Sequence, residues 1–225
     1  MKGIIKIVLF AFCLLPQLAL AQEQLSREEQ ADRQYNRYDY YFASINYLKL
    51  AESKKHVKTI VLERLADCYR QMNNYLAAEQ VYGKAIERSD ASPLSNLYYG
   101  EMLQTNYKFD LAKKQYEIYG QKTNDTPKMV NKIASCDAAE QWLGQKNKNT
   151  VSNVSTLNSK ASDWGLSYFG KNGLVFTSER DSVQPNNKRK YGWNGMPWTQ
   201  LFAANNEAQN VNPIHIISDK YGIKE

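Results

Sequence analysis

Small and aromatic residues recur at a fixed spacing through the first half of the chain. One pattern appears twice between Arg64 and Tyr119, 34 residues apart. It consists of an alanine or glycine, then an aromatic residue, then an alanine that is followed four residues later by a tyrosine. The matching pairs are Ala66 and Gly100, Tyr75 and Phe109, Ala78 and Ala112, and Tyr82 and Tyr116. A small residue facing a small-x3-aromatic pattern suits two antiparallel helices whose backbones approach closely. The pattern therefore predicts pairs of helices that repeat.

The repeat extends in both directions from this segment. Upstream, an earlier copy lies 35 residues before the first, at Ala31, Tyr40, Ala43 and Tyr47. Downstream, Ala134 follows Gly100 by 34 residues, and one more helical pattern runs to Trp142 without a partner helix. This period and pattern are typical of tetratricopeptide (TPR) repeats, which stack into solenoids with capping ends. We expect an α-helical TPR solenoid over residues 22–143, with three helical pairs and a capping helix.

Helical periodicity is lost after Gly144, and the pattern changes to short alternating runs. We interpret residues 144–162 as a linker. Three strands are expected over residues 163–169, 174–178 and 200–204, with a hairpin turn at Gly170-Lys171-Asn172-Gly173. We expect residues 205–225 to form a poorly ordered tail or to fold back onto the helices.

Residues 1–21 have the features of a secretory signal peptide. Lys2 and Lys6 form a basic start, residues 7–15 an apolar core, and Ala19-Leu20-Ala21 a small-x-small cleavage site. We expect an exported chain beginning at Gln22. Phe12 stands before Cys13 where lipoprotein processing needs a small residue, so we expect no lipid anchor. Later apolar runs are too short to span a bilayer, which predicts no transmembrane segment in the mature chain.

The charge is mildly basic. The formal net charge of +6 falls to about +4 when Lys2 and Lys6 are removed with the signal peptide. Export and the lack of a base-reading motif argue against a nucleic-acid partner, in spite of the cluster Lys188-Arg189-Lys190.

Cysteine and histidine usage gives no sign of a metal, a cofactor or a reaction. Cys68 and Cys136 occupy equivalent positions two repeats apart, too far for a disulfide, so we expect two free, buried thiols. The only histidines are His56 and His215, and the sequence has none of the common catalytic motifs. The sequence therefore predicts no catalytic residues, no metal site and no cofactor, and the protein is interpreted as not an enzyme.

The second half of the chain resembles part of a known architecture. A strand, a Gly hairpin, the run Leu174-Val175-Phe176-Thr177-Ser178 before Arg180, and a later Leu201-Phe202 resemble the first blade of a WD40-like (PD40) β-propeller. With the signal peptide, the repeats and the segment Leu157-Asn158-Ser159, the chain resembles the PorE-like OmpA-family proteins of Bacteroidota. That family implies TPRs, a propeller and a C-terminal OmpA-like peptidoglycan-binding domain. Some members serve type IX secretion and gliding.

The sequence also departs from this family. A propeller needs about four to eight blades, and only one fits before Glu225; no OmpA-like module is present. We therefore expect a truncated member, with peptidoglycan contact confined to a domain absent here. Trp164, Trp193 and Trp198 are interpreted as propeller packing rather than as a sugar-binding platform.

These features favour a non-catalytic periplasmic scaffold at the outer membrane that binds protein partners of an envelope assembly. In a TPR frame, positions flanking Ala66 and Gly100 face the concave groove. These are Ile60, Glu63, Asp67, Arg70, Gln71, Leu94, Leu97, Glu101, Gln104 and Thr105. The groove is equally consistent with filling by the protein's own cap or tail. The alternative functions are an exported peptide- or carbohydrate-processing protein whose missing part carried the activity, and a fragment without function. Asp181-Ser182-Val183 resembles a bacterial O-glycosylation motif, with Ser182 as the acceptor.

Overall fold

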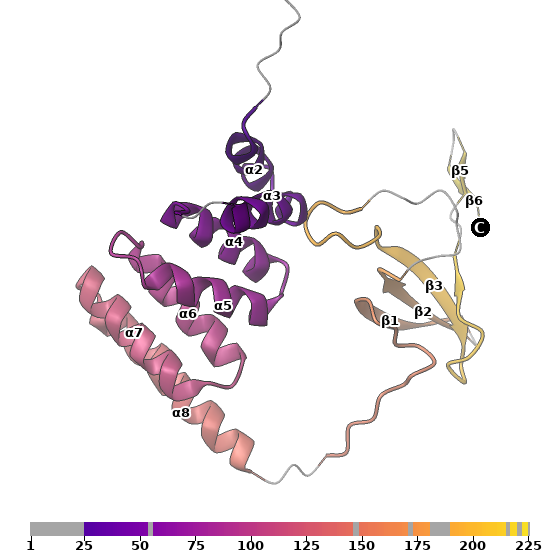
Figure 1. The fold of residues 1–225 in the computed structure, drawn as a ribbon. Coiled ribbons are helices and arrows are strands. Elements are labelled where there is room, and N and C mark those ends of the chain that lie inside the picture. The colour runs from indigo at the N-terminus through magenta and orange to yellow at the C-terminus, as the bar shows by residue number, and fades with distance from the viewer. Residues whose placement is uncertain are drawn as a thin grey trace, which may run out of the picture.

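A stack of helices is followed by a small antiparallel sheet in the computed structural model (Figure 1). The structure describes residues 25–53, 56–145, 149–170, 173–180, 190–214, 217–219 and 222–224. The predicted signal peptide, His215 and the predicted glycosylation site Ser182 lie outside the described residues. Within the described residues, none of the helices has both the length and the apolar character needed to cross a membrane.

Seven helices within the described part of the chain form three hairpins and one final helix, and each packs against the next. They are α2 (Arg27–Asn36), α3 (Tyr40–Ser53), α4 (Thr59–Gln71), α5 (Tyr75–Ile86), α6 (Pro93–Thr105), α7 (Phe109–Thr123) and α8 (Thr126–Gly144). This arrangement matches the helical solenoid expected from the repeat pattern.

Side-chain caps mark the starts of three of the described helices. Ser26 begins α2 with a complete capping box, and the Asn74 side chain accepts a hydrogen bond from the Ala77 amide at the start of α5. Ser92 caps α6 ahead of Pro93, which takes the first helical position. At the start of α8, Thr126 lies inside the helix, and Asp125 takes the cap position without a side-chain bond.

The seams between helices are lined by the repeating small and aromatic residues. Tyr47, Tyr82 and Tyr116 are at most 1% exposed, and the small residues that precede them by four positions are fully buried. These small residues are Ala43, Ala78 and Ala112. Cys68 and Cys136 are free and buried, which confirms the prediction made from their spacing. The regular spacing of these residues along the chain therefore reflects a packing geometry that is repeated from hairpin to hairpin.

Two helical glycines allow a test of this close packing. A methyl group added at Gly100 would lie 2.7 Å from the buried Tyr116 ring, whereas one added at Gly83 makes ordinary contact with the Tyr99 hydroxyl at 3.4 Å. We expect Gly100→Ala to lower the free energy of unfolding by about 1–2 kcal/mol, since overpacking outweighs the gain in helix propensity. Gly83→Ala should raise it by about 0.5–1 kcal/mol. Urea unfolding followed by circular dichroism measures both, and a gain in both variants would contradict a tight seam.

The sheet contains four antiparallel strands in the order in which they occur along the chain. They are β1 (Asp163–Phe169), β2 (Gly173–Ser178), β3 (Gln200–Asn205) and β4 (Asn212–Pro213). A separate two-stranded hairpin follows, made of β5 (Ile217–Asp219) and β6 (Gly222–Lys224). Phe176 and Phe202 are register partners with stacked rings 5.8 Å apart, and they pack with Leu157, Leu174 and Ala204 into the core of the sheet.

The first three strands lie where the sequence predicts them, but the boundaries around the sheet differ. Residues beyond Ala204 continue the sheet through β4, and Ala208 and Val211 pack against its core, so the predicted end at Ala204 is too early. The predicted linker also ends too late, because Leu157 is buried in the same core. A chain segment without a regular pattern can thus still belong to a core when one apolar side chain anchors it.

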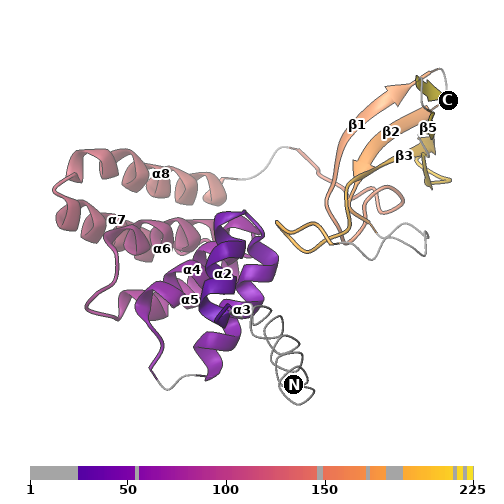
Figure 2. The same cartoon turned by 90° about the horizontal axis from the view of Figure 1, so that it is seen from above.

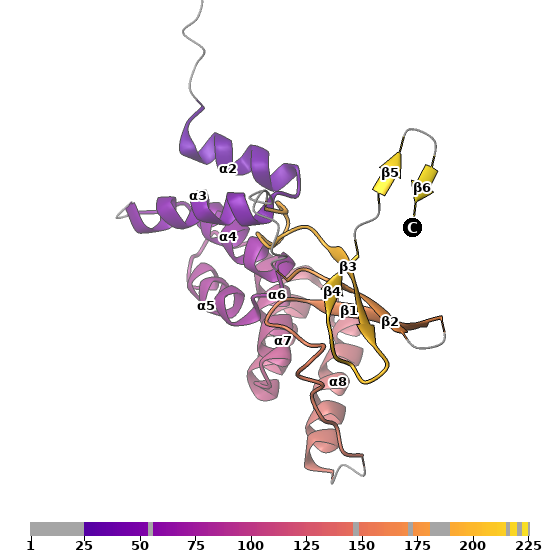
Figure 3. The same ribbon diagram turned by 90° about the vertical axis from the view of Figure 1, so that its right-hand side faces the viewer.

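The interpretation of the three tryptophans as propeller packing is wrong for this sheet. Trp164 and Trp198 are more than half exposed, and neither belongs to the core of the sheet. Trp193 lies on the loop that precedes β3, and its ring packs against the core of the helices instead. Figures 2 and 3 show this loop reaching from the sheet toward the α2 and α3 region.

Candidate functional site

Two adjoining hollows form a groove along one side of the helical stack. The first has a volume of about 620 Å³ and is lined mainly by residues of α2, α4 and α6. The second, of about 560 Å³, lies mainly between residues of α4, α6 and α8. Arg70 and Gln71 line both hollows, so the two are neighbours along the stack.

Nine of the ten predicted groove residues line these hollows. The first hollow contains Ile60, Glu63, Asp67, Arg70, Gln71 and Leu94, and the second adds Glu101, Gln104 and Thr105. The exception is Leu97, which is half-buried and packs against the core around Leu103 and Tyr116. The repeat offset thus identifies the groove face of α4 well, whereas on α6 it includes one position that faces the core.

Asp67 is the most buried charged residue of the groove and forms its floor. It is 9% exposed, and its carboxylate accepts hydrogen bonds from the Tyr35 hydroxyl at 2.6 Å and from Arg70 Nε at 2.9 Å. The Tyr82 hydroxyl lies 3.4 Å from Asp67 Oδ1, the oxygen to which Arg70 donates. Asp67 therefore ties α2, α4 and α5 together from inside the groove.

Charge and burial fix the protonation of this cluster. Burial raises the pKa of Tyr35 and of Tyr82, and the negative charge of Asp67 raises both further. Both tyrosines therefore stay neutral and remain hydrogen-bond donors well above physiological pH. The Arg70 guanidinium lies over the Tyr98 ring, 4.1 Å from its centroid, and so links the cluster to α6.

The acidic position of Asp67 recurs in the neighbouring hairpins, and each copy is bonded to an adjacent hairpin. Asp32 pairs with Arg64, and it accepts a hydrogen bond from Tyr47 at 2.6 Å. Glu101 pairs with Lys132 of α8 at 2.7 Å. These pairs connect successive hairpins along the stack. The acidic side chains predicted to contact a partner are thus already engaged within the stack.

The side chains left for a partner lie on the rim of the groove. Ile60 is 44% and Leu94 45% exposed, and they occupy the same position of successive hairpins, 34 residues apart. Thr105, at the opposite end of α6 from Leu94, is exposed in the second hollow. The rim combines apolar surface with neutral polar groups, while the paired charges leave the floor close to electrically neutral.

Trp193 also lines the second hollow, and sequence reasoning missed it there. Its indole nitrogen donates to the backbone oxygen of Gln71 at 2.8 Å, from a loop 122 residues away in the chain. The protein's own chain therefore occupies one edge of the groove. The segment that does so is a loop before β3, rather than the cap or the tail considered from the sequence.

Comparison with known proteins does not indicate what this groove binds. The chain matches no protein-family model and no curated protein sequence. Among the described residues, no group of three or more His, Cys, Asp or Glu side chains is placed to hold a metal ion. The interpretation of the groove therefore depends on its own geometry.

Proposed function

We propose that this protein is a TPR-type scaffold of the bacterial cell envelope, exported to the periplasm, whose groove holds an extended segment of a protein partner. The observation that carries the proposal is the groove itself, in which equivalent positions of successive hairpins line two adjoining hollows. A surface that repeats along a stack matches a ligand that also extends along it. The role in secretion, motility or anchoring implied by the PorE-like resemblance is part of the same proposal, as is the identity of the sheet as a propeller blade.

The chemistry of the rim indicates the kind of segment that fits. Ile60 and Leu94 offer two exposed apolar contacts at equivalent positions, so the partner should carry apolar side chains spaced to reach both. Gln71 lines both hollows, and its amide side chain suits the partner's main chain. The Gln104 amide also lines the second hollow, but it is already bonded to Tyr116 and Ser135. Since Asp67 and Glu101 are paired internally, a strongly charged partner would find few free counter-charges.

Photo-crosslinking from the rim tests the proposal. A photoreactive residue at Ile60 or Leu94 is expected to give a discrete crosslinked protein in living cells, whereas the same residue at Leu76 should give none. Leu76 is 65% exposed and lines neither hollow, which makes it a matched control. Fractionation of the same cells should place the crosslinked product in the periplasm or with the outer membrane. Equal crosslinking from Leu76, or a product confined to the cytoplasm, would contradict the proposal.

A further inference from the structure

The loop from Lys190 to Pro197, called the latch loop below, leaves the sheet and lies on the helices. Its Trp193 ring stands edge-on to Tyr40 at 4.9 Å and runs beside Tyr38 at 6.4 Å. The indole N–H donates to the Gln71 carbonyl at 2.8 Å. One side chain thus combines aromatic packing with a directed hydrogen bond, which is the usual form of an anchor residue.

Two consecutive residues of the latch loop satisfy opposite ends of two helices. The Gly192 carbonyl accepts a hydrogen bond from the Tyr41 amide at 2.9 Å, in the first turn of α3. Trp193 bonds to Gln71, the last residue of α4. Amides of a first turn and carbonyls of a last turn have no partner within their own helix. The latch loop supplies both missing partners: an acceptor for the Tyr41 amide and a donor for the Gln71 carbonyl. It therefore acts as a cap on both helix ends.

Two glycines allow the latch loop to come this close. A Cβ atom at Gly192 would lie 2.0 Å from Asp39 Oδ1, and one at Gly195 would lie 2.2 Å from the Tyr41 ring. Gly195 also has a left-handed backbone, with φ of +74°. Lys190 adds a hydrogen bond from Nζ to the Tyr41 hydroxyl at 2.9 Å. The sequence of the latch loop is therefore fitted to the helical surface at several positions at once.

The latch loop also holds its own shape. Lys190 and Pro197 form a bridge at its base, and the amides of Tyr191 and Gly195 close it internally, each at 2.8 Å. Asn194 donates to both carboxylate oxygens of Glu179, at 3.1 and 3.2 Å, and so fixes the latch loop to the end of β2. A turn that is already shaped loses less conformational entropy when it docks.

We propose that the latch loop is an intramolecular ligand of the helical stack: it holds the sheet against the helices and closes the groove at Gln71, where the two hollows meet. Trp193 lines the second hollow, so a segment lying along the whole groove has to displace it. This gating depends on the proposed function of the groove, whereas the docking of the latch loop does not. Because the latch loop and the helices belong to one chain, docking is intramolecular and is favoured over binding to another copy at low protein concentration.

A single methyl group tests the docking in the full-length mature chain. Gly192→Ala should expel the latch loop, and exchange of the Tyr41 amide should become at least about tenfold faster as its acceptor is lost. The Trp193 indole proton, observed by NMR, should lose its protection as well. Gly144→Ala is the matched control, because nothing lies within 4 Å of a methyl group there. Adding Asp39→Ala to Gly192→Ala removes the obstructing carboxylate. Exchange of the Tyr41 amide in the double variant should therefore be as slow as it is in Asp39→Ala alone.

Gly195→Ala is made as a second variant, because its methyl group would lie 2.2 Å from the Tyr41 ring and its φ of +74° disfavours alanine. Unchanged exchange at Tyr41 and Trp193 in both Gly192→Ala and Gly195→Ala would overturn the latch, whatever the groove binds. The gating is read from photo-crosslinking at Thr105, beside Trp193, compared with Ile60 in the first hollow. Gly192→Ala should increase the yield at Thr105 several-fold and leave that at Ile60 unaltered. Faster exchange with equal yields at both positions would overturn the gating while the docking stands. Crosslinks from neither position would overturn the gating together with the proposed function.

Discussion

Replacing Asp67 with alanine is expected to lower the free energy of unfolding of the helical stack by about 3–5 kcal/mol. The change leaves the Arg70 guanidinium without its counter-ion and removes the acceptor of the Tyr35 hydroxyl. Tyr82, 1% exposed, loses its closest acceptor as well. Each of these groups is wholly or partly buried, so water cannot fully replace the carboxylate. Urea unfolding followed by far-ultraviolet circular dichroism measures the loss.

Two further variants separate charge from packing. Asp67→Asn keeps an acceptor oxygen of similar size, so its cost should be intermediate, at about 1–3 kcal/mol. Asp110→Ala removes a carboxylate that is 80% exposed in its pair with Lys113, and it should change stability by less than about 1 kcal/mol. A loss in Asp67→Ala no larger than in Asp110→Ala would show that the floor cluster does not hold the hairpins together.

The role of Asp67 shows how far the sequence could go for this site. The repeat offset places Asp67 and Glu101 on the same face of successive helices, and the structure has both in the groove. An offset identifies a face but carries no information about partners on other helices. Asp67 was therefore expected to meet a ligand, whereas Tyr35 and Arg70 already surround it. Periodicity predicts position, and the partners follow only from the packing of whole hairpins.

The latch loop marks the second limit of sequence reasoning. Trp193 and Gln71 are 122 residues apart, and no periodic pattern links a loop to the end of a helix. The signal that was available is the pair of glycines around one tryptophan, Gly192 and Gly195, which allows a close backbone approach. By contrast, the strands β1 to β3 lie where alternation predicts them, since alternation reflects a local two-residue period.

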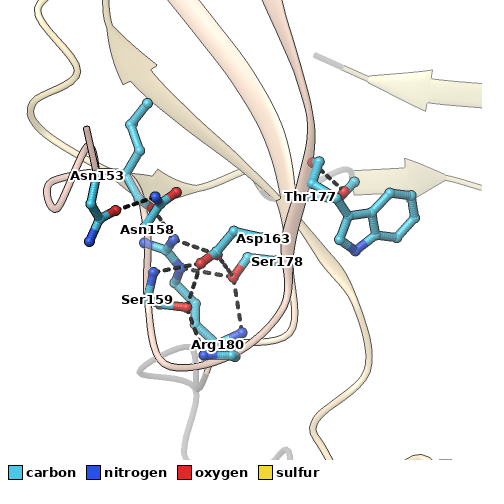
Figure 4. A network of polar contacts seen from close by, with 10 residues as sticks. Asn153, Asn158, Ser159, Asp163, Thr177, Ser178 and Arg180 are labelled. Atoms are coloured by element: carbon cyan, nitrogen blue, oxygen red, sulfur yellow. Dashed lines mark hydrogen bonds and ion pairs between the residues drawn. The ribbon is translucent and has the colours of Figure 1, made fainter. Parts of the chain in front are cut away.

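In the sheet, Asp163 holds together the segments that flank the core (Figure 4). One carboxylate oxygen accepts from Ser178 at 2.5 Å and from Arg180 Nη2 at 2.7 Å, and the other accepts from the Ser159 backbone amide and hydroxyl. Arg180 also donates to the Leu157 carbonyl and lies 5.0 Å from the centroids of the two core phenylalanine rings. This network joins β1, the end of β2 and the segment before β1 into one unit.

The network makes the stability of the sheet depend on pH. Burial alone would raise the pKa of Asp163, but hydrogen bonds from Arg180, Ser178 and Ser159 outweigh it and hold the pKa well below its usual range. A carboxylate whose pKa is lower in the folded state stabilises the fold when it is ionised in both states. The contribution is therefore complete above the unfolded value of about 3.8, and it is lost progressively as the pH falls from there toward the folded pKa.

Asp163→Asn should consequently lower the free energy of unfolding of the sheet by about 2–3 kcal/mol near neutral pH, since it replaces charge-assisted bonds and leaves Arg180 without a counter-ion. The difference from the parent protein should shrink as the pH falls below about 3.8. Urea unfolding followed by tryptophan fluorescence in a Trp142→Phe background reports on the sheet through Trp164 in β1 and Trp198 just before β3, and on the docked latch loop through Trp193. Glu207→Gln, the same charge change at an exposed site, should cost less than about 0.5 kcal/mol. The difference in free energy of unfolding between Asp163→Asn and the parent could instead stay constant with pH. That result would mean that the hydrogen-bond geometry, and not the charge of Asp163, supports the sheet.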